Sequence, residues 1–561
     1  MCCIYNMVKR LKEARKSERK EALKMQTDFH LLYPPNYDRT SEIPMKDFKF
    51  IESLQLDAMI ILIKESYRGF ADLSLEKFFS TDERVLEYRL GVVEDLVENP
   101  SLYETFCKAV SIIYNIHDMR HAMDNEFTVD SALRCVRYLE MYQEIVNLFA
   151  DALEKADIHS EGMKNFKKEI ENITESSEYQ SLNTELSKME MNFGYIKSVT
   201  VGINLDGNLR PKEAGLVSVN TDYFRPGNIM DRLLKRDKTD DKVLMSALYP
   251  LTKGLHGEEL KALNYSLNAA LQTIFAKSLR EFEPLVQNYY HVNTTMFVSL
   301  LDDIRFLTAG VKFILSMKEK GFVMCRPQIA PMKEKRCELT QVYNPMLAIK
   351  AVENTIVSNA FTLDEKGRFY LITGPNHGGK SIFAYSIGMA QALFQLGLFV
   401  PAERALMSPV SGIYTHFPSS DENNYGKGRL ESECARLSEI MGKLSDTDML
   451  LMDESFSSTS GLEAGYIASE VLTGIGIIGC CGLFVTHIHD LTQQVDTYNA
   501  HPRNKGKIDN LVAMMESKEE GTRSYKVIRT TPDGLSYAKD IAKRYGLDLE
   551  GILGKYEDDK A

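Results

Sequence analysis

The 561-residue sequence contains no tryptophan, no Cys-x-x-Cys pair and no signal-peptide pattern at its charged N-terminus. Its nine cysteines are odd in number and scattered, which is not the pattern of a disulfide framework or a zinc site. The longest candidate apolar run, Gly474–Val485, is shorter than the roughly 20 residues that a membrane-spanning helix needs. We therefore expect reduced thiols, a cytoplasmic protein and no membrane partner.

An excess of positive charge is also missing. The chain has 67 basic and 79 acidic residues, a net charge of -12. This balance excludes a protein that coats nucleic acid by bulk charge, so any such contact needs a local basic surface. Residues 1–45 form a candidate basic arm, because Lys9–Lys24 is rich in Lys and Arg. That stretch is either a solvated helix or an arm that touches nucleic acid.

The length allows about three or four domains of roughly 150 residues each. Apolar residues recur at helical spacing through 46–330, which predicts a mainly helical core or lever domain. A strand-rich insert interrupts it at 196–225, where Asp206-Gly207 is a hairpin signal. From 331 to 561, short apolar runs alternate with helical segments, which predicts an α/β domain with a parallel sheet.

The strongest motif is a phosphate-binding loop, or P-loop, that fits G-x-x-x-x-G-K-[ST]. It lies between an apolar strand, Phe369–Thr373, and an apolar helix, Ile382–Leu396. Glycines allow the backbone to wrap a polyphosphate and direct its N–H groups inward. The Lys would reach the β- and γ-phosphates of ATP and the Ser would bind Mg²⁺. The loop residues are Gly374, Pro375, Asn376, His377, Gly378, Gly379, Lys380 and Ser381.

Two further apolar strands end in residues suited to ATP hydrolysis. Met449–Asp453 is followed by Glu454, so Asp453 would bind Mg²⁺ through water and Glu454 would act as general base. The second strand ends at His487, which can contact the γ-phosphate or the attacking water. Taken singly, the acids could be ordinary strand-end residues and the His an exposed one. Their position after a P-loop favours the catalytic interpretation.

Five segments, in this order, resemble the ATPase domain of the MutS family of DNA mismatch-repair proteins over Leu339–Leu547. They are TGPNHGGKS, the VPAE segment, LLMDESFSSTSGLEAG, FVTHIHDLTQ and DGLSYAKDIAKRYGL. The resemblance implies an ABC-type P-loop ATPase that works with ATP and Mg²⁺ as a homodimer. Upstream, DERVLEYRLGVVEDLVENPSLYETF is similar to the family's helical core, and the insert lies where the family has its DNA clamp.

Carried over residue by residue, the resemblance implies nucleotide contacts from Asn376 and Asn359. It implies catalytic roles for Asn376, Glu454 and His487. Val357 stands where the family usually has an aromatic residue that stacks on the base, so the sequence does not identify a stacking residue.

The sequence departs from the family at the loop that reaches the partner's nucleotide. The expected serine position is Gly428, so its backbone N–H or the Arg429 guanidinium would serve instead, unless Arg429 is only a surface residue. No mismatch-reading domain with a Phe-x-Glu wedge and no C-terminal nuclease module is expected.

The resemblance implies an ATP-dependent DNA-binding protein of mismatch repair or recombination that recognises DNA by shape. Two alternatives stay open: an ATPase that acts on structured RNA or ribosomes, and a nucleotide-gated scaffold. We expect nucleic-acid contacts at the 196–225 insert, at Lys9–Lys24 and at the tips of the long helices.

Overall fold

The computed structural model forms two compact units. One comprises the described parts of 108–155 and 167–301, and the other those of 28–107, 156–166 and 302–561. The predicted helical region is thus shared between both units. The basic arm lies outside the described residues. The structure describes residues 29–38, 40, 44–56, 73–121, 129–193, 198–205, 207, 211–220, 294–351, 356–418, 428–456, 459–517, 522–532 and 545–558.

The first unit is helical and has an aromatic core. Rings from separate helices meet there: Tyr142 and Phe149 of α6, Tyr179 of α8 and Phe297 of α11. Phe149 and Phe297 are stacked at 6.1 Å between ring centroids. The helices are α6 (Val129–Lys155), α8 (Ser177–Phe193), α11 (Thr295–Ser299) and parts of α5 (Pro100–His121) and α7 (Glu161–Glu175).

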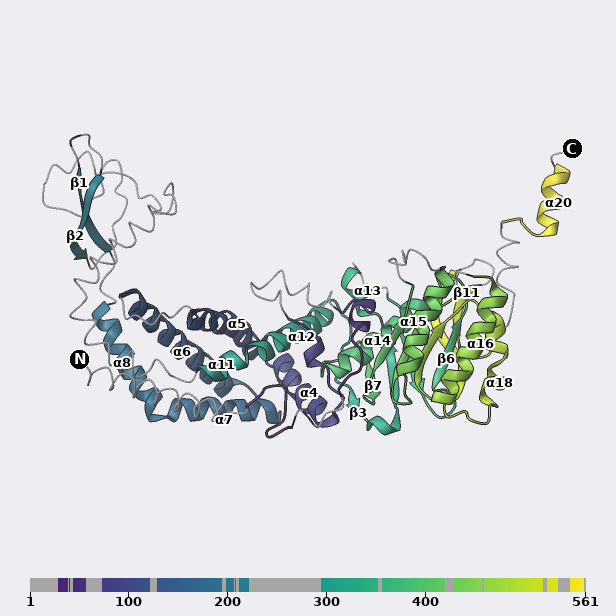
Figure 1. Ribbon diagram of the computed structural model, residues 1–561, viewed down its shortest axis with the longest axis horizontal. Coiled ribbons are helices and arrows are strands. Elements are labelled where there is room, and N and C mark those ends of the chain that lie inside the picture. The colour runs from purple at the N-terminus through teal and green to yellow at the C-terminus, as the bar shows by residue number, and fades with distance from the viewer. Residues whose placement is uncertain are drawn as a thin grey trace, which may run out of the picture. The chain divides into compact units, whose positions relative to one another are not determined.

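A two-stranded antiparallel sheet belongs to the same unit (Figure 1). Its strands are β1 (Ser198–Leu205) and β2 (Pro211–Asn220), which pair from Ser198 opposite Asn220 to Leu205 opposite Pro211. Gly207, of the hairpin signal, lies between the two strands. The ends of the predicted insert, 196–197 and 221–225, lie outside the described residues.

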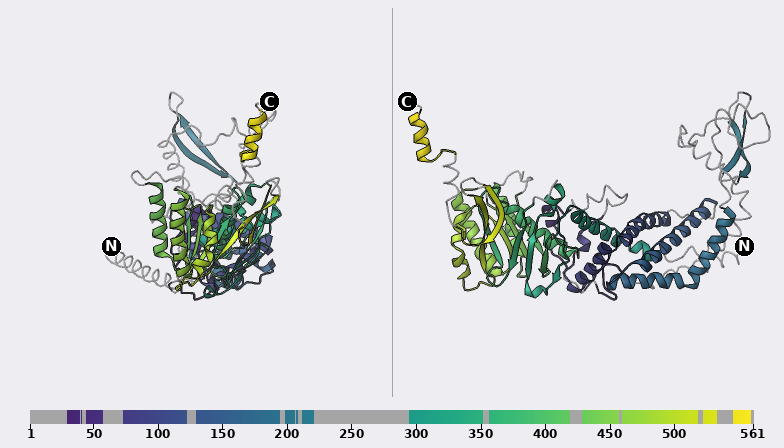
Figure 2. Two further views of the ribbon diagram at one scale, coloured as in Figure 1. Left: turned by 90° about the vertical axis from the view of Figure 1, so that its right-hand side faces the viewer. Right: turned by 180° about the vertical axis from the view of Figure 1, so that it is seen from behind.

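The second unit contains a six-stranded sheet in the order β12-β11-β6-β10-β9-β8 (Figures 1 and 2). All neighbouring pairs are parallel except β11 and β12. The carboxyl ends of the parallel strands therefore meet at one edge, called here the carboxyl edge, and their starts form the amino edge. The strands are β6 (Phe369–Thr373), β8 (Ile413–His416), β9 (Met449–Asp453), β10 (Cys481–Val485), β11 (Ile508–Ser517) and β12 (Thr522–Arg529).

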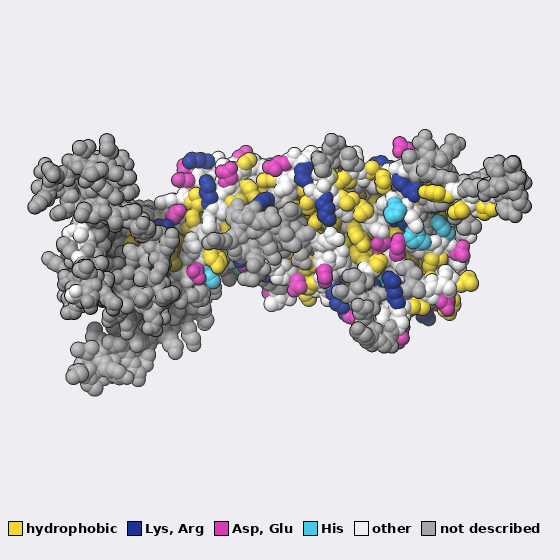
Figure 3. Space-filling model, turned by 90° about the horizontal axis from the view of Figure 1, so that it is seen from above, with side chains coloured by type: hydrophobic (Ala, Val, Ile, Leu, Met, Phe, Trp, Pro, Cys, Tyr) yellow, Lys and Arg dark blue, Asp and Glu magenta, His cyan; other side chains and the backbone are white. Residues whose placement is uncertain are grey.

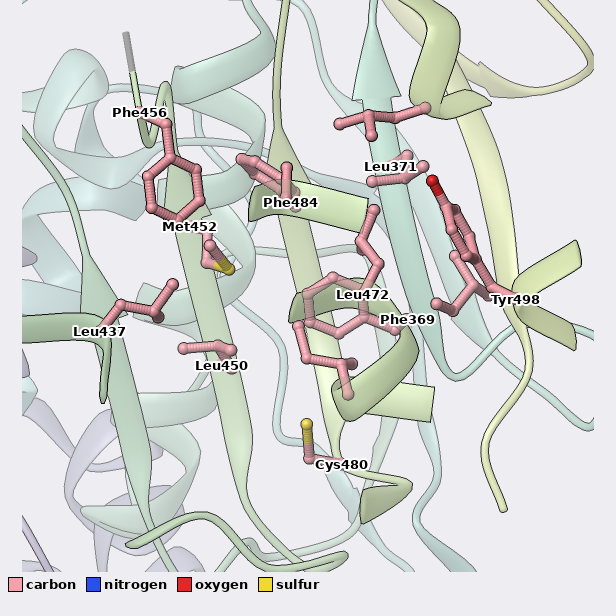
Figure 4. Close-up of a cluster of buried hydrophobic side chains, with 14 of the residues drawn as sticks. Phe369, Leu371, Leu437, Leu450, Met452, Phe456, Leu472, Cys480, Phe484 and Tyr498 are labelled. Carbon is pink, nitrogen blue, oxygen red and sulfur yellow. The ribbon is translucent and has the colours of Figure 1, made fainter. Parts of the chain in front are cut away.

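Helices α14 (Lys380–Gln395), α15 (Arg429–Lys443) and α16 (Gly461–Ile478) cover this sheet. Side chains of β6, β9 and β10 pack with α15 and α16 in one hydrophobic cluster (Figure 4). By length and composition α16 could cross a membrane, but its inward side chains belong to this cluster. Every residue of β6, β9 and β10 is buried, which explains why these strands appear as continuous apolar runs in the sequence.

A four-stranded sheet, in the order β3-β7-β4-β5, completes the α/β architecture predicted for the C-terminal part. Its strands are β3 (Gln328–Ile329), β4 (Cys337–Val342), β5 (Asn359–Leu363) and β7 (Arg404–Met407). The unit also holds α2 (Phe50–Ser53), η3 (Glu76–Phe78), α4 (Glu83–Glu98), α12 (Leu301–Glu319), η4 (Met332–Glu334), α13 (Pro345–Lys350), α17 (His489–Gln493), α18 (Val495–Asn499) and α20 (Leu549–Asp558).

The far end of α14 is tied to the segment that precedes α4. The buried Gln395 side chain donates to the Ser80 and Val410 carbonyls, and the Ser80 N–H donates back to the Gln395 carbonyl at 2.8 Å. Arg89 of α4 is fully buried and donates to the Leu32 carbonyl at 2.9 Å. Buried polar groups with satisfied hydrogen bonds fix one arrangement. These hydrogen bonds connect the end of α14 to this helical segment.

Candidate functional site

The P-loop joins the end of β6 to the start of α14, as its sequence predicts. Gly374 has φ +132°, and a β-carbon there would lie 2.7 Å from the Ala513 carbonyl oxygen. Only glycine fits this conformation and this approach of two backbones. Lys380 folds over the loop, and its ammonium donates to the carbonyls of Gly374 at 3.0 Å and Pro375 at 2.9 Å. Burial lowers the pKa of Lys380.

Asp453, at the end of β9, faces the first turn of α14. Its carboxylate accepts hydrogen bonds from the Ser381 hydroxyl at 2.9 Å and the Tyr385 hydroxyl at 3.3 Å. Burial raises the pKa of Asp453, and the nearby Glu454 carboxylate contributes to this rise. A cation at this position would stabilise the ionised form of Asp453.

Glu454 and His487 form a pair beside it. His487 Nε2 lies 2.7 Å from Glu454 Oε1, and both side chains are partly exposed. Parallel pairing of β9 and β10 places Asp453 opposite Val485, which brings the residues after both strands together. Glu454 has φ +47° and Phe456 φ +66°. Left-handed backbone at non-glycine residues costs energy and is typical of functional sites, so the strain supports a role for this turn.

The structure thus brings together Lys380, Ser381, Asp453, Glu454 and His487. Seen from above, histidine, acidic and basic side chains gather on one face of the α/β unit (Figure 3).

Three other residues predicted to bind the nucleotide, Asn376, His377 and Asn359, do not belong to this group of side chains. Asn376 and His377 are exposed. The amide of Asn359 donates to the Tyr525 carbonyl at 3.1 Å and accepts from the Val527 N–H at 2.8 Å. Asn359 therefore joins β5 to β12, and its own polar atoms are engaged with protein backbone.

The candidates for contact with a partner's nucleotide lie at the start of α15. Gly428 precedes the helix in extended conformation, and Arg429 Nε lies 3.7 Å from Glu433 Oε1 on the next turn. The other oxygen of Glu433 accepts from the Phe456 N–H at 2.8 Å. Helix α15 is therefore linked to the strained turn that follows Asp453.

A buried histidine strengthens this link. His416, at the end of β8, has its Nδ1 2.6 Å from the Ser455 hydroxyl and its Nε2 3.2 Å from the Glu433 carbonyl oxygen. Burial lowers the pKa of His416 to about 4, so the ring is neutral near pH 7. A neutral ring has one donor and one acceptor nitrogen, which suits two such neighbours.

Sequence reasoning missed Tyr385, Arg523 and Tyr525. Tyr385 had a signal, because it lies four residues after Ser381 and so on the same face of α14. Arg523 Nε donates to the Asn376 carbonyl at 3.1 Å, and Tyr525 is 48% exposed with φ +55°. A β-carbon on Gly379 would lie 3.5 Å from Cδ1 of the Tyr525 ring. The irregular pairing of β11 and β12 re-aims this ring, and no sequence pattern revealed it.

The donors present suit Mg²⁺ with a bound polyphosphate. Mg²⁺ takes oxygen ligands, and proteins usually supply one or two of them while phosphates and water supply the rest. Ser381 and Asp453 offer a hydroxyl and a carboxylate on adjacent elements. Among the described residues, no group of three or more His, Cys, Asp or Glu side chains is placed to hold a metal without such help from phosphates and water.

Two family models match most of the chain. The model described as MutS domain V matches residues 370–549, which include the P-loop, Asp453, Glu454 and His487. The model described as MutS2 N-terminal domain matches residues 81–320.

Among curated proteins, the chain is similar to DNA mismatch repair proteins MutS. That of Chlorobium phaeovibrioides is 31% identical over 245 residues, 43% of this chain and 26% of the relative. That of Halothermothrix orenii is 30% identical over 209 residues, 36% of this chain and 22% of the relative. The DNA mismatch repair protein msh-2 of Neurospora crassa is 28% identical over 237 residues, 39% and 25% respectively. The matched part thus spans about a quarter of each relative.

Proposed function

This chain belongs to the MutS family, and on that premise we propose that its α/β unit binds ATP with Mg²⁺ and hydrolyses it. One observation carries the proposal. The carboxyl edge of the sheet combines a P-loop Lys, a Ser–Asp pair at 2.9 Å and a Glu–His pair at 2.7 Å. These groups supply phosphate binding, metal binding and proton transfer, the three requirements of phosphoryl transfer to water.

Each residue then has a defined task. The P-loop N–H groups and Lys380 hold the phosphates, while Ser381 and Asp453 hold the metal. Bound Mg²⁺ neutralises charge on the phosphates. Glu454 accepts a proton from the attacking water, and His487 holds the Glu454 carboxylate in place. Tyr525 offers an exposed ring beside Gly379 on which the base can stack, in place of the aromatic residue missing at Val357.

We propose further that hydrolysis takes place in a homodimer of ABC type, each nucleotide being shared between an α/β unit and the partner's α15. Either the Gly428 N–H or Arg429 would reach the partner's γ-phosphate. Arg429 would then leave Glu433 and bind the phosphate. Because Glu433 also accepts a hydrogen bond from the Phe456 N–H, this change would reach the Ser455–Phe456 turn. Gln395 and Ser80 would pass the movement of α14 to the helical segment.

The partner would be DNA, recognised by its shape in mismatch repair or recombination, because the named relatives are DNA mismatch repair proteins. A second candidate is structured RNA, including ribosomal RNA. This candidate stays open because the net charge of -12 fits a high-affinity binder of duplex DNA poorly. A scaffold that only binds ATP fits less well, because Asp453 and Glu454 are both present.

The experiment compares ATP turnover of the wild-type chain and Glu454→Gln. We expect kcat to fall about 10²- to 10⁴-fold, the usual contribution of a general base, while ATP binding is kept. Glu470→Gln, at an exposed position on α16, is the matched control and should turn over ATP normally. Equal rates for Glu454→Gln and wild type would remove Glu454 from the mechanism.

ATP turnover and direct binding, both measured at low salt, identify the partner. Homoduplex, mismatched duplex, branched DNA and structured RNA are added in turn to the wild-type chain. Stimulation by branched or mismatched DNA supports the DNA proposal, and stimulation by RNA alone supports the second candidate. Absence of binding to all four at low salt, where phosphate contacts are strongest, would exclude a nucleic-acid partner.

A further inference from the structure

A cluster of basic side chains lies at the amino edge of the six-stranded sheet, away from the P-loop. A polar pocket of about 320 Å³ opens there between the turn before β6 and the loop between α18 and β11. Strands β6 and β11 start side by side, with Phe369 opposite Ile508. The five residues of β6 separate this pocket from the P-loop by about 16 Å. The pocket is therefore not a part of the nucleotide site.

The lining of this pocket is basic although the chain as a whole is acidic. Arg368, Lys505 and Lys507 face a single carboxylate, that of Glu365. The other carboxylate near Lys505, Asp446, is paired with Lys335 at 2.6 Å. No aliphatic, Phe or Tyr side chain lines the pocket, so it offers nothing to a hydrocarbon. The remaining lining residues are Asn499, His501 and Asn504.

The loop 500–507 exposes three cationic side chains. Arg503, Lys505 and Lys507 are exposed, whereas the alternate residues Asn504 and Gly506 are half-buried and buried. Pro502 and Arg503 form a turn that the hydrogen bond from the Asn504 N–H to the His501 carbonyl closes at 2.9 Å, so the three cations project from an irregular loop. Within the described part of the chain these three cations form no ion pair.

Backbone hydrogen bonds hold this loop in place. The N–H groups of Lys505 and Gly506 both donate to the Gly476 carbonyl, at 2.9 and 3.1 Å, at the end of α16. The Asn499 side chain pairs with the Ile508 backbone, at 2.8 Å in both directions. The Lys507 carbonyl accepts from the Arg368 N–H at 2.7 Å. The cations therefore extend from a fixed base, which reduces the entropy lost when they engage a ligand.

We propose that this loop, defined here as the amino-edge loop (residues 499–507), binds the phosphodiester backbone of a nucleic acid. Several long cationic side chains on one loop suit successive phosphates, and contacts to phosphates carry no sequence specificity. An open site of this kind takes a polymer, which can pass across it, better than a small anion. The inference rests on the proposed function in so far as nucleic acid is the partner. The new part of the inference is the place at which the α/β unit would contact the nucleic acid.

The test uses the full chain with Arg503, Lys505 and Lys507 all changed to Gln. Binding of a labelled DNA duplex and of a labelled RNA hairpin is measured by fluorescence anisotropy over a series of salt concentrations. We expect the triple variant to bind at least about tenfold more weakly than the wild-type chain at low salt. The slope of log affinity against log salt concentration should be smaller by about three, one for each lost phosphate contact. The stronger effect on one probe identifies the nucleic acid. Lys164→Gln with Lys350→Gln, two exposed lysines elsewhere in this unit, is the control with similar loss of charge.

Four outcomes would contradict this inference, and the first three leave the proposed function standing. Wild-type affinity and salt slope in the triple variant would overturn the inference and leave the ATPase proposal standing. Competition by poly-glutamate as strong as that by nucleic acid would overturn the assignment to phosphate. Loss of ATP turnover without nucleic acid in the triple variant would also overturn it, because the loop would then support the nucleotide site. Absence of nucleic-acid binding by the wild-type chain would overturn both the inference and the nucleic-acid part of the proposed function.

Discussion

The two edges of the six-stranded sheet are built differently for ligands of the same charge. At the carboxyl edge, strained turns and glycines bring backbone groups and short side chains together, with Gly374 at φ +132° and Glu454 at φ +47°. At the amino edge, a loop held by ordinary hydrogen bonds extends long cations into solvent. Short, fixed groups can position a reacting atom, whereas long exposed ones supply attraction that salt screens.

The carboxyl edge of this fold can bring together the residues of a catalytic site, whereas the amino edge is suited to binding alone. Parallel strands converge their ends on one edge, and Asp453, Glu454 and His487 meet there because β9 and β10 are neighbours. The amino edge holds the starts of the same strands, and Arg368 and Lys507 directly precede β6 and β11 there. We expect the first edge to be sensitive to acid and the second to salt.

The largest expected effect in this comparison is a loss of folding stability at acid pH, which we attribute to His416. Burial lowers the pKa of His416 from 6.5 to about 4. Between these values the unfolded chain binds a proton that the folded chain does not. Stability is therefore fully present above pH 6.5 and falls as the pH drops toward 4, by about 3 kcal/mol in total. Urea unfolding at a series of pH values measures it.

His416→Asn should lose this part of the pH dependence. Ser455→Ala removes the hydrogen bond at 2.6 Å but keeps the buried ring, so it should retain most of it. The prediction is wrong if wild type and His416→Asn show the same slope of unfolding free energy against pH.

A smaller effect is expected from Lys380→Met, which removes the cation of the carboxyl edge. Hydrogen bonds to charged groups contribute about 1.5–3 kcal/mol, so ATP affinity should fall about 10- to 100-fold. Calorimetry with ATP and Mg²⁺ measures it. The triple variant of the amino-edge loop should keep its ATP affinity, because distant sites act additively. Weaker ATP binding in that triple variant would break the separation of the two edges.

The smallest effect concerns the base. Tyr525→Ala should weaken ATP binding about tenfold, at the lower end of the roughly 1–3 kcal/mol measured for stacking of a base on an aromatic ring. Tyr525→Phe keeps the ring and should bind ATP as the wild type does. Equal ATP affinities for Tyr525→Ala and Tyr525→Phe would show that the Tyr525 ring does not contact the base. Neither variant should change the salt slope that the amino-edge loop produces.

Much of the α/β unit could be predicted from the sequence. The strand Phe369–Thr373 was predicted with the bounds that the structure gives it, because a fully buried parallel strand is a continuous apolar run. The predicted helix Ile382–Leu396 corresponds to α14, which begins two residues earlier, at Lys380, and ends at Gln395. Strand order had no comparable signal, because pairing depends on contacts between distant segments.

The candidate site was predicted unevenly for the same reason. Lys380, Ser381, Asp453, Glu454 and His487 follow strands and carry local signals, and the structure brings them together. Their catalytic roles stay predictions, as do those of Gly428 and Arg429. Tyr525 was missed because a bulge, not a pattern, directs it to Gly379. The amino-edge loop was missed although HPRNKGK has its cations at every second position.

The sequence by itself determined which residues carry the chemistry: a loop that only glycines allow, acids at the ends of apolar strands, and the segments that resemble MutS proteins. These features are local, since they depend on residue type and on spacing along the chain. The tertiary structure decided which of these residues meet. It also decided that the Asn359 amide forms hydrogen bonds with the backbone of β12, and that three cations of an acidic chain are exposed at the opposite edge. Those outcomes depend on strand order and on hydrogen bonds between distant segments, which no local pattern encodes.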